Sequence, residues 1–119
     1  MIFLDSDDFL FKNTLRNIEK VIQKKSVDLI ITRFKAEEPP YSNDYLFKKK
    51  FLQNDVNEFL KHINRINYQA NVCWHYIIKK DLIKKNRVKF LNAKLNEDQE
   101  FVTKILCSMK TFDFYKDYY

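Results

Sequence analysis

Residues 1–8 of the 119-residue chain read MIFLDSDD: four apolar residues are followed at once by four polar ones. A short apolar run of this kind predicts a buried β-strand, with the polar residues in a loop at its carboxyl end. In open α/β sheets, ligands bind beyond the carboxyl ends of the strands. The opening stretch therefore predicts an α/β fold and the position of a site within it.

The rest of the chain alternates between helical and strand-like patterns. Apolar residues at helical spacing, several of them after Asn or Asp cap residues, predict helices over residues 13–25, 54–66, 81–85 and 96–109. Runs of β-branched and aromatic residues predict strands or extended segments over residues 27–34, 72–78 and 112–119. Residues 37–40, EEPP, predict a surface loop, whereas residues 45–52 carry no decisive pattern.

The size and composition predict a single folded domain over residues 1–119. Hydrophobic residues make up 45% of the chain and aromatic residues 16%, which is too apolar for a disordered tail. No apolar run approaches the roughly 20 residues that span a bilayer, and no signal-peptide core precedes Asp5. We therefore expect a cytoplasmic protein.

The charge balance favours an anionic partner. Lys and Arg number 22 against 16 acidic residues, and the basic residues gather at positions 24–25, 48–50, 79–80 and 84–85. Such clusters are most often a solvated surface; the functional alternatives are a phosphate-rich ligand, the anionic inner leaflet of a membrane, or nucleic acid. Nucleic acid is not expected, because no nucleic-acid-binding motif accompanies the charge. The chain contains no Gly, which excludes Gly-rich phosphate-binding loops.

Two cysteines, Cys73 and Cys107, are too few for a disulfide framework and are expected to be buried thiols. Cys73 and His75 lie close in sequence, but a structural zinc site needs four ligands and the remaining ones have no motif spacing.

The acidic residues after the first apolar run can hold a metal ion. Asp5 and Asp7 are two apart, so on an extended chain their carboxylates point the same way. Converging carboxylate oxygens suit a hard divalent cation that also binds phosphate oxygens. The structural alternative is that residues 5–8 form a turn or a helix cap, as such residues often do.

Several segments together resemble the family-2 glycosyltransferases. Residues 2–8 are similar to the strand and DXD motif of that family, and Trp74 with residues 76–83 to its tryptophan segment. Phe90 matches the phenylalanine that commonly precedes the family's acidic motif, and residues 95–101, LNEDQEF, resemble its Glu-Asp-x-x-Phe block. Motifs in the same order and at a separation normal for the family are more specific than any one alone.

The resemblance implies part of a GT-A fold, with a mixed sheet and flanking helices, and an inverting sugar transfer. Asp7 would bind Mn²⁺ or Mg²⁺, and Asp5 would lie near the metal or the donor ribose. Asp98 would be the general base that takes the proton of the acceptor hydroxyl. Trp74 and Glu97 would belong to the acceptor side, and Glu97 is also the nearest competitor for the role of base.

The resemblance also implies the partners. The donor is a nucleotide sugar, with a UDP-sugar expected, and the acceptor is a glycan or a lipid-linked glycan of surface polysaccharide or lipooligosaccharide synthesis. The reaction would take place in the cytoplasm, at the cytoplasmic face of the inner membrane. In the family a nucleotide-binding half precedes the DXD strand, so a complementary N-terminal half or an oligomer is an expected partner, and the 119 residues alone are not expected to be a competent enzyme.

Two other functions fit parts of the sequence. A haloacid-dehalogenase-like phosphatase also begins with an apolar strand and Asp-x-Asp, with Asp5 as nucleophile and Asp7 as acid/base. However, residues 8–9, Asp-Phe, replace the usual Gly-Thr of that motif. The other alternative is a basic binding module in which all these acids are caps or surface residues.

Overall fold

The computed structural model describes residues 1–6, 9–34, 42–66, 72–92 and 96–118. The elements in chain order are α1 (Thr14–Lys24), β1 (Leu29–Arg33), the 3₁₀ helix η1 (Asp44–Lys48), α2 (Val56–Arg65), the 3₁₀ helix η2 (Cys73–His75), β2 (Tyr76–Ile78), α3 (Lys80–Lys85), α4 (Glu97–Ser108) and β3 (Phe112–Tyr118). The helices predicted after the first eight residues are confirmed, as are the strands near residues 27–34 and 112–118, and η1 occupies part of the undecided stretch. The extended segment predicted over residues 72–78 is a strand only from Tyr76, because residues 73–75 form the 3₁₀ helix η2. The loop predicted at residues 37–40 lies outside the described residues.

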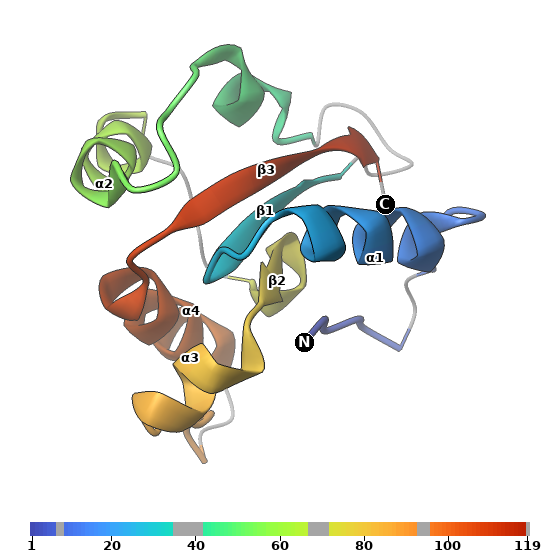
Figure 1. The fold of residues 1–119 in the computed structure, drawn as a ribbon. Helices are drawn as coiled ribbons and strands as arrows, with labels where there is room; N and C mark the ends of the chain where they lie inside the picture. Colours follow the sequence, from blue (N-terminus) through green and yellow to red (C-terminus); the bar gives the residue numbers. More distant parts are fainter. Residues whose placement is uncertain (7–8, 35–41, 67–71, 93–95, 119) are drawn as a thin grey trace.

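The strands form one mixed sheet in the order β2-β1-β3. The central strand β1 is antiparallel to β2, with Ile30 opposite Ile77, and parallel to β3, with Ile30 opposite Asp113. The chain forms η1, α2 and η2 between β1 and β2, and α3 and α4 between β2 and β3 (Figure 1). The predicted α/β class with a mixed sheet is confirmed.

Helices cover both faces of the sheet. Side chains alternate along each strand, so apolar residues lie on both faces and need to be covered. On one face, Ile30, Ile77 and Tyr115 pack against Ile18 of α1. On the other face, a larger core joins the strands to η1, α2, α3 and α4. Sixteen buried residues belong to that second core and only five to the α1 core. The sheet is therefore covered much more fully on one side than on the other.

Residues 1–4 depart from the prediction of a buried strand. Only Ile2 pairs, in one antiparallel bridge with Ile77, while Met1 exchanges two backbone hydrogen bonds with Ile78. Leu4 remains 46% exposed. The pairing stops because β2 is three residues long and gives way to η2, whose 3₁₀ backbone cannot continue a ladder.

Two predicted caps are correct in position but not in hydrogen bonding. Asn13 and Asn96 precede α1 and α4 with φ of 68° and 62°, the left-handed region that Asn tolerates better than most residues. Neither side chain makes a cap hydrogen bond. No helix in the described part of the chain is long and apolar enough to cross a membrane.

The two thiols differ in exposure. Cys73 is buried, as predicted, but Cys107 is exposed, so that prediction was wrong. Cys107 lies on the outer side of α4, since the inner side is taken by Val102, Ile105 and Leu106.

Candidate active site

The segment that carries Asp5 runs alongside β2 toward η2. Because the bridge between Ile2 and Ile77 is antiparallel, the chain after Ile2 advances toward the residues that precede Ile77. The negative charge of Asp5 helps to raise the pKa of the Cys73 thiol, so Asp5 lies within electrostatic range of that thiol. Asp5 itself is exposed. The end of the predicted DXD strand therefore lies beside η2.

Asp98 reaches the same place from the first turn of α4. The backbone N–H of Cys73 donates a hydrogen bond to Oδ2 of Asp98 over 3.3 Å. Burial, followed by the charges of Asp98 and Asp5, raises the pKa of the Cys73 thiol to about 12. The Cys73 thiol is thus protonated at neutral pH, under the influence of the Asp5 and Asp98 carboxylates. Two of the predicted site residues, 93 positions apart, thus both act on Cys73 of η2.

An aromatic cluster, Phe3, Phe90 and Phe101, packs the two segments that carry these carboxylates against each other. The rings of Phe90 and Phe101 stack with centroids 4.1 Å apart and an interplanar angle of 5°. Phe3 packs edge-on against both, at 5.5 Å from each centroid. Asp5 is two residues from Phe3 and Asp98 three residues from Phe101, so the cluster anchors both acidic segments.

Trp74 stands next to this acidic site on η2 and is partly exposed. Its ring packs edge-on against Phe34, at 5.0 Å between centroids, and against His75, at 4.1 Å. His75 in turn stacks on Phe34 at 4.4 Å, and its carbonyl accepts a hydrogen bond from Thr32 Oγ1 over 2.8 Å. The indole is therefore held by neighbours on two sides with one part open to solvent.

His75 is a supporting residue to which the sequence assigned no role. Burial lowers the pKa of its imidazole to about 3, so the ring is neutral under ordinary conditions. The neutral ring packs between Phe34 and Trp74. Its position directly after Trp74 is the only sign of this role in the sequence.

Other predicted site residues contribute less to the described geometry. Glu97 is the first residue of α4 and is partly buried. Asp7 and Asp8 lie outside the described residues. Within the described ranges, no three His, Cys, Asp or Glu side chains are grouped so that they could hold a metal ion. Of the proposed metal ligands, Asp5 alone has a described position.

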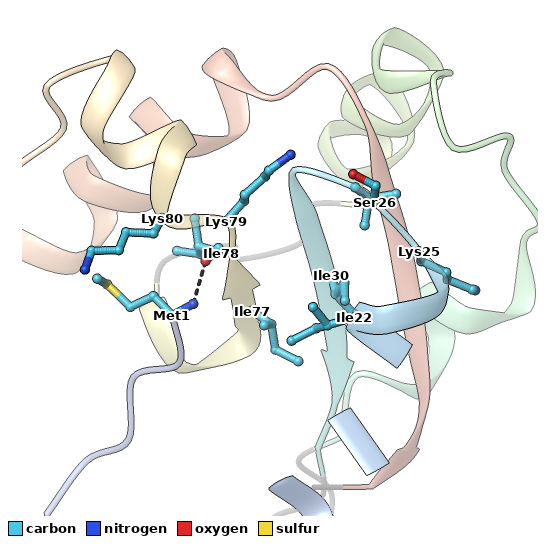
Figure 2. Close-up of a pocket in the computed structure, with 10 residues that line it drawn as sticks. Met1, Ile22, Lys25, Ser26, Ile30, Ile77, Ile78, Lys79 and Lys80 are labelled. Carbon is cyan, nitrogen blue, oxygen red and sulfur yellow. Dashed lines mark hydrogen bonds between the residues drawn. The ribbon is translucent and has the colours of Figure 1, made fainter. Parts of the chain in front are cut away.

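A hollow of about 290 Å³ lies away from the acidic site, between α1 and β2. Figure 2 shows Ile22 of α1 and Ile77 of β2 pointing toward each other across it. Met1, Lys79 and Lys80 also line the hollow.

The fold, with these acidic groups at η2, is similar to part of a GT-A-type glycosyltransferase. No protein-family model matches the chain. The chain is 31% identical over 119 residues to the poly(ribitol-phosphate) beta-N-acetylglucosaminyltransferase TarP of Staphylococcus aureus (strain N315), an alignment that covers 99% of this chain and 35% of TarP. The resemblance to family-2 glycosyltransferases is thereby confirmed.

A solved structure supports the fold directly. The crystal structure of S. aureus TarS 1-349 superposes with a TM-score of 0.75 and 24% sequence identity, and the match covers 98% of this chain and 33% of that one. The predicted partial GT-A fold is confirmed. The chain spans about a third of the length of each of these two relatives.

Proposed function

We propose that this chain supplies the acceptor side and the general base of an inverting, metal-dependent glycosyltransferase that uses a nucleotide-sugar donor. The observation that carries the proposal is that Asp5 and Asp98 both act on Cys73 of η2, beside the partly exposed ring of Trp74. The similarity to TarP over nearly the whole chain supports the same reaction class.

Asp98 acts as the base in this proposal. Its carboxylate accepts the proton of an acceptor hydroxyl while that oxygen attacks the anomeric carbon, and the nucleoside diphosphate leaves with the electrons of the broken C–O bond. One oxygen, Oδ2, is held by the Cys73 N–H, so the carboxylate has a fixed orientation. Positioning of this kind is what proton transfer in the transition state requires.

The carboxylate of Asp5 is a hard oxygen donor, the kind of ligand that a divalent cation such as Mg²⁺ prefers. With Asp7, it would hold Mn²⁺ or Mg²⁺. When bound, the ion supplies positive charge that stabilises the departing diphosphate. Trp74 offers an aromatic face to the acceptor sugar, and Glu97 lies one residue from the base on the same turn.

We further propose an acceptor that carries phosphate groups. TarP acts, by its name, on poly(ribitol-phosphate). In this chain, Lys79 and Lys80 follow β2 and are exposed, and Lys84 and Lys85 extend the basic surface along α3. Ammonium groups attract a phosphate polymer, an interaction that weakens as salt screens it. The proposal places the reaction in the cytoplasm, at the inner face of the membrane.

The metal and donor part is tested on the chain itself by titrating UDP with and without Mn²⁺ in a calorimeter. Binding that needs Mn²⁺ and is weakened at least about tenfold by Asp5→Asn or Asp7→Asn supports the proposal, at roughly 1.4 kcal/mol per tenfold. Asp81→Asn, an exposed acid of α3, is the matched control. UDP binding that is equal with and without Mn²⁺ contradicts the metal role of Asp5 and Asp7. A loss of UDP affinity in Asp81→Asn as large as in the Asp5 and Asp7 variants contradicts it as well.

The acceptor part is tested by measuring binding of a poly(ribitol-phosphate) oligomer and of uncharged dextran at increasing salt. Selective, salt-sensitive binding that Lys79→Gln with Lys80→Gln weakens, and Lys61→Gln on α2 does not, supports an anionic acceptor. Mg²⁺-dependent release of phosphate from an aryl phosphate would instead favour the phosphatase alternative.

A further inference from the structure

Buried polar side chains gather where β1 ends. In the described part of the chain, four polar residues are buried: Thr14, Thr32, Asn43 and His75. Thr14 begins α1, whereas the other three meet at the carboxyl end of β1, where Thr32 and Asn43 are only 0% and 1% exposed. A buried polar group costs free energy unless it is hydrogen-bonded, so each of these groups needs a defined partner.

Asn43 fixes the backbone at the end of β1. Its Nδ2 donates to the Thr32 carbonyl over 2.7 Å, and its Oδ1 accepts from the Phe34 N–H over 3.0 Å. The register between β1 and β3 shifts between Thr32 and Arg33, so the ladder is irregular at this point. The amide of Asn43 therefore takes the place of a strand partner and fixes the backbone from which Phe34 projects.

The Thr32 hydroxyl ties β1 to η2. The ladder between β1 and β2 ends with Ile31 opposite Tyr76. One residue further along β1, Thr32 Oγ1 donates to the His75 carbonyl over 2.8 Å. This bond extends the connection past the end of the ladder, where the 3₁₀ backbone of η2 offers no strand pairing.

The short turn η2 depends on anchors outside itself. The His75 N–H makes a hydrogen bond of 3.5 Å to the residue that precedes η2, which is long, and 3₁₀ geometry is poorer than that of an α-helix. Thr32 holds the turn at His75, and Asp98 holds it at the Cys73 N–H. Trp74 stands between these two points, so both of them set its position.

Phe34 completes the support of Trp74. Its ring stacks on His75 at 4.4 Å and packs edge-on against the indole at 5.0 Å between centroids. Asn43 therefore reaches Trp74 through Phe34, and Thr32 reaches it through the His75 carbonyl. Because Thr32 and Asn43 are buried, neither side chain can touch a substrate.

We propose that Thr32 and Asn43 are positioning residues, which hold the Trp74 indole at a fixed distance and angle from the Asp98 carboxylate. An acceptor sugar that stacks on the indole then presents its hydroxyl to that carboxylate. A misplacement of about 1 Å can cost roughly 10²-fold in rate, so the anchors of η2 matter for the reaction as well as for the fold. The inference rests on the proposed function, since it takes Asp98 as the base and Trp74 as part of the acceptor side.

Fluorescence tests the positioning in the 119-residue chain, because Trp74 is its only tryptophan. Thr32→Val keeps the branched shape of the side chain but leaves the His75 carbonyl without its donor, whereas Thr32→Ser keeps the hydroxyl. Acrylamide should quench the indole of Thr32→Val at least about twofold more efficiently than that of the parent, because the local structure opens more readily. Thr32→Ser should remain close to the parent.

Thr14→Val is the matched control, because Thr14 is also a buried threonine, 3% exposed, but lies on α1. It should leave the quenching unchanged, even where it lowers the free energy of unfolding as much as Thr32→Val does. Asn43→Ala should raise the quenching in the same direction as Thr32→Val. Circular dichroism and urea denaturation of each variant check that the fold persists.

Transfer kinetics supply the second readout, in a hybrid enzyme in which this chain replaces the aligned segment of TarP. With a poly(ribitol-phosphate) oligomer, Thr32→Val should lower kcat/KM for the acceptor at least about tenfold per folded enzyme, while KM for the UDP-sugar stays unchanged. Thr32→Ser should restore transfer. A merely structural role would lower transfer only in proportion to the folded enzyme.

Four results overturn the inference. They are equal quenching in Thr32→Val and the parent, an equal rise in Thr14→Val, a Thr32→Ser variant that behaves like Thr32→Val, and acceptor kcat/KM in Thr32→Val that matches the parent per folded enzyme. Unchanged quenching in Asn43→Ala overturns the part assigned to Asn43. Failure of the proposed function looks different: the fluorescence of the chain responds as expected, but the parent hybrid transfers no sugar.

Discussion

Cys73 and Asp98 are joined by a hydrogen bond of 3.3 Å from the backbone N–H of Cys73 to Oδ2 of Asp98, across 25 residues of sequence. A carboxylate in the first turn of a helix is stabilised by the helix dipole wherever it points. Here it points at η2, beside Trp74 and the charge of Asp5. The bond gives Asp98 a contact with a second element in addition to its place in the first turn of α4.

The surroundings of Cys73 predict an unreactive thiol. Because its pKa is raised to about 12 and the residue is buried, the thiolate that reacts with iodoacetamide is scarce at pH 8. The exposed Cys107 should be alkylated first, by at least about a hundredfold in rate, as measured by mass spectrometry of the two peptides. In concentrated urea both should react alike. Equal rates in the folded chain would contradict the placement of Cys73 against Asp98.

The aromatic cluster predicts a graded loss of stability. Phe101 is almost fully buried, so Phe101→Ala should lower the free energy of unfolding by about 3–5 kcal/mol. Phe90 is partly exposed but stacked on Phe101, so Phe90→Ala should cost about 1–2 kcal/mol. Leu52→Ala, at an exposed position, should stay within about 0.5 kcal/mol. Urea denaturation measures all three, and a Phe90→Ala variant as stable as the control would show that the cluster does not hold the site.

The buried imidazole of His75 predicts a loss of stability in acid. Its pKa is lowered to about 3 in the fold, while the unfolded chain takes up a proton near the ordinary value of 6.5. The unfolded state therefore binds more protons between these values, and the free energy of unfolding should fall by roughly 1.4 kcal/mol for each pH unit below 6.5 from this group alone.

Urea denaturation at several pH values between 7 and 4 measures that slope. His75→Phe keeps a flat ring between Phe34 and Trp74 and should flatten the pH dependence relative to the parent. His62→Gln on α2 should keep most of it. An unchanged slope in His75→Phe would place the acid sensitivity in other groups.

The α-helices after residue 8 and most of the strands could be predicted because apolar periodicity and cap residues are local properties. The 3₁₀ helices η1 and η2 were not predicted. The extent of pairing at residues 1–4 could not, since it depends on where a distant partner, β2, gives way to η2. An apolar run predicts burial only where another element covers it, and Leu4 is left uncovered.

The position and spacing of Asp5 and Asp7 alone suggested a metal site, whereas Trp74 and Asp98 could be assigned only through the family resemblance. That resemblance singled out Asp5, Trp74 and Asp98, and in the fold the two acids both act on Cys73 of η2, where Trp74 stands. The groups that position them are tertiary: the Cys73 N–H, the packing of Phe3 on Phe101, and His75 behind Trp74. No spacing rule links Cys73 to Asp98 or Phe3 to Phe101, and the orientation of His75 depends on Phe34, which is distant in sequence, so these supports could not be predicted.

Sugar transfer by a hybrid enzyme, in which this chain replaces the aligned segment of TarP, tests the central claim most directly. The substrates are a UDP-sugar and a poly(ribitol-phosphate) oligomer. Asp98→Asn keeps an oxygen for the Cys73 N–H, so folding and donor binding should persist while transfer falls by roughly 10²–10⁴-fold. Glu97→Gln, the neighbouring acid, should cost much less. Transfer by Asp98→Asn that falls only in proportion to lost folded protein would contradict the assignment of Asp98 as the base.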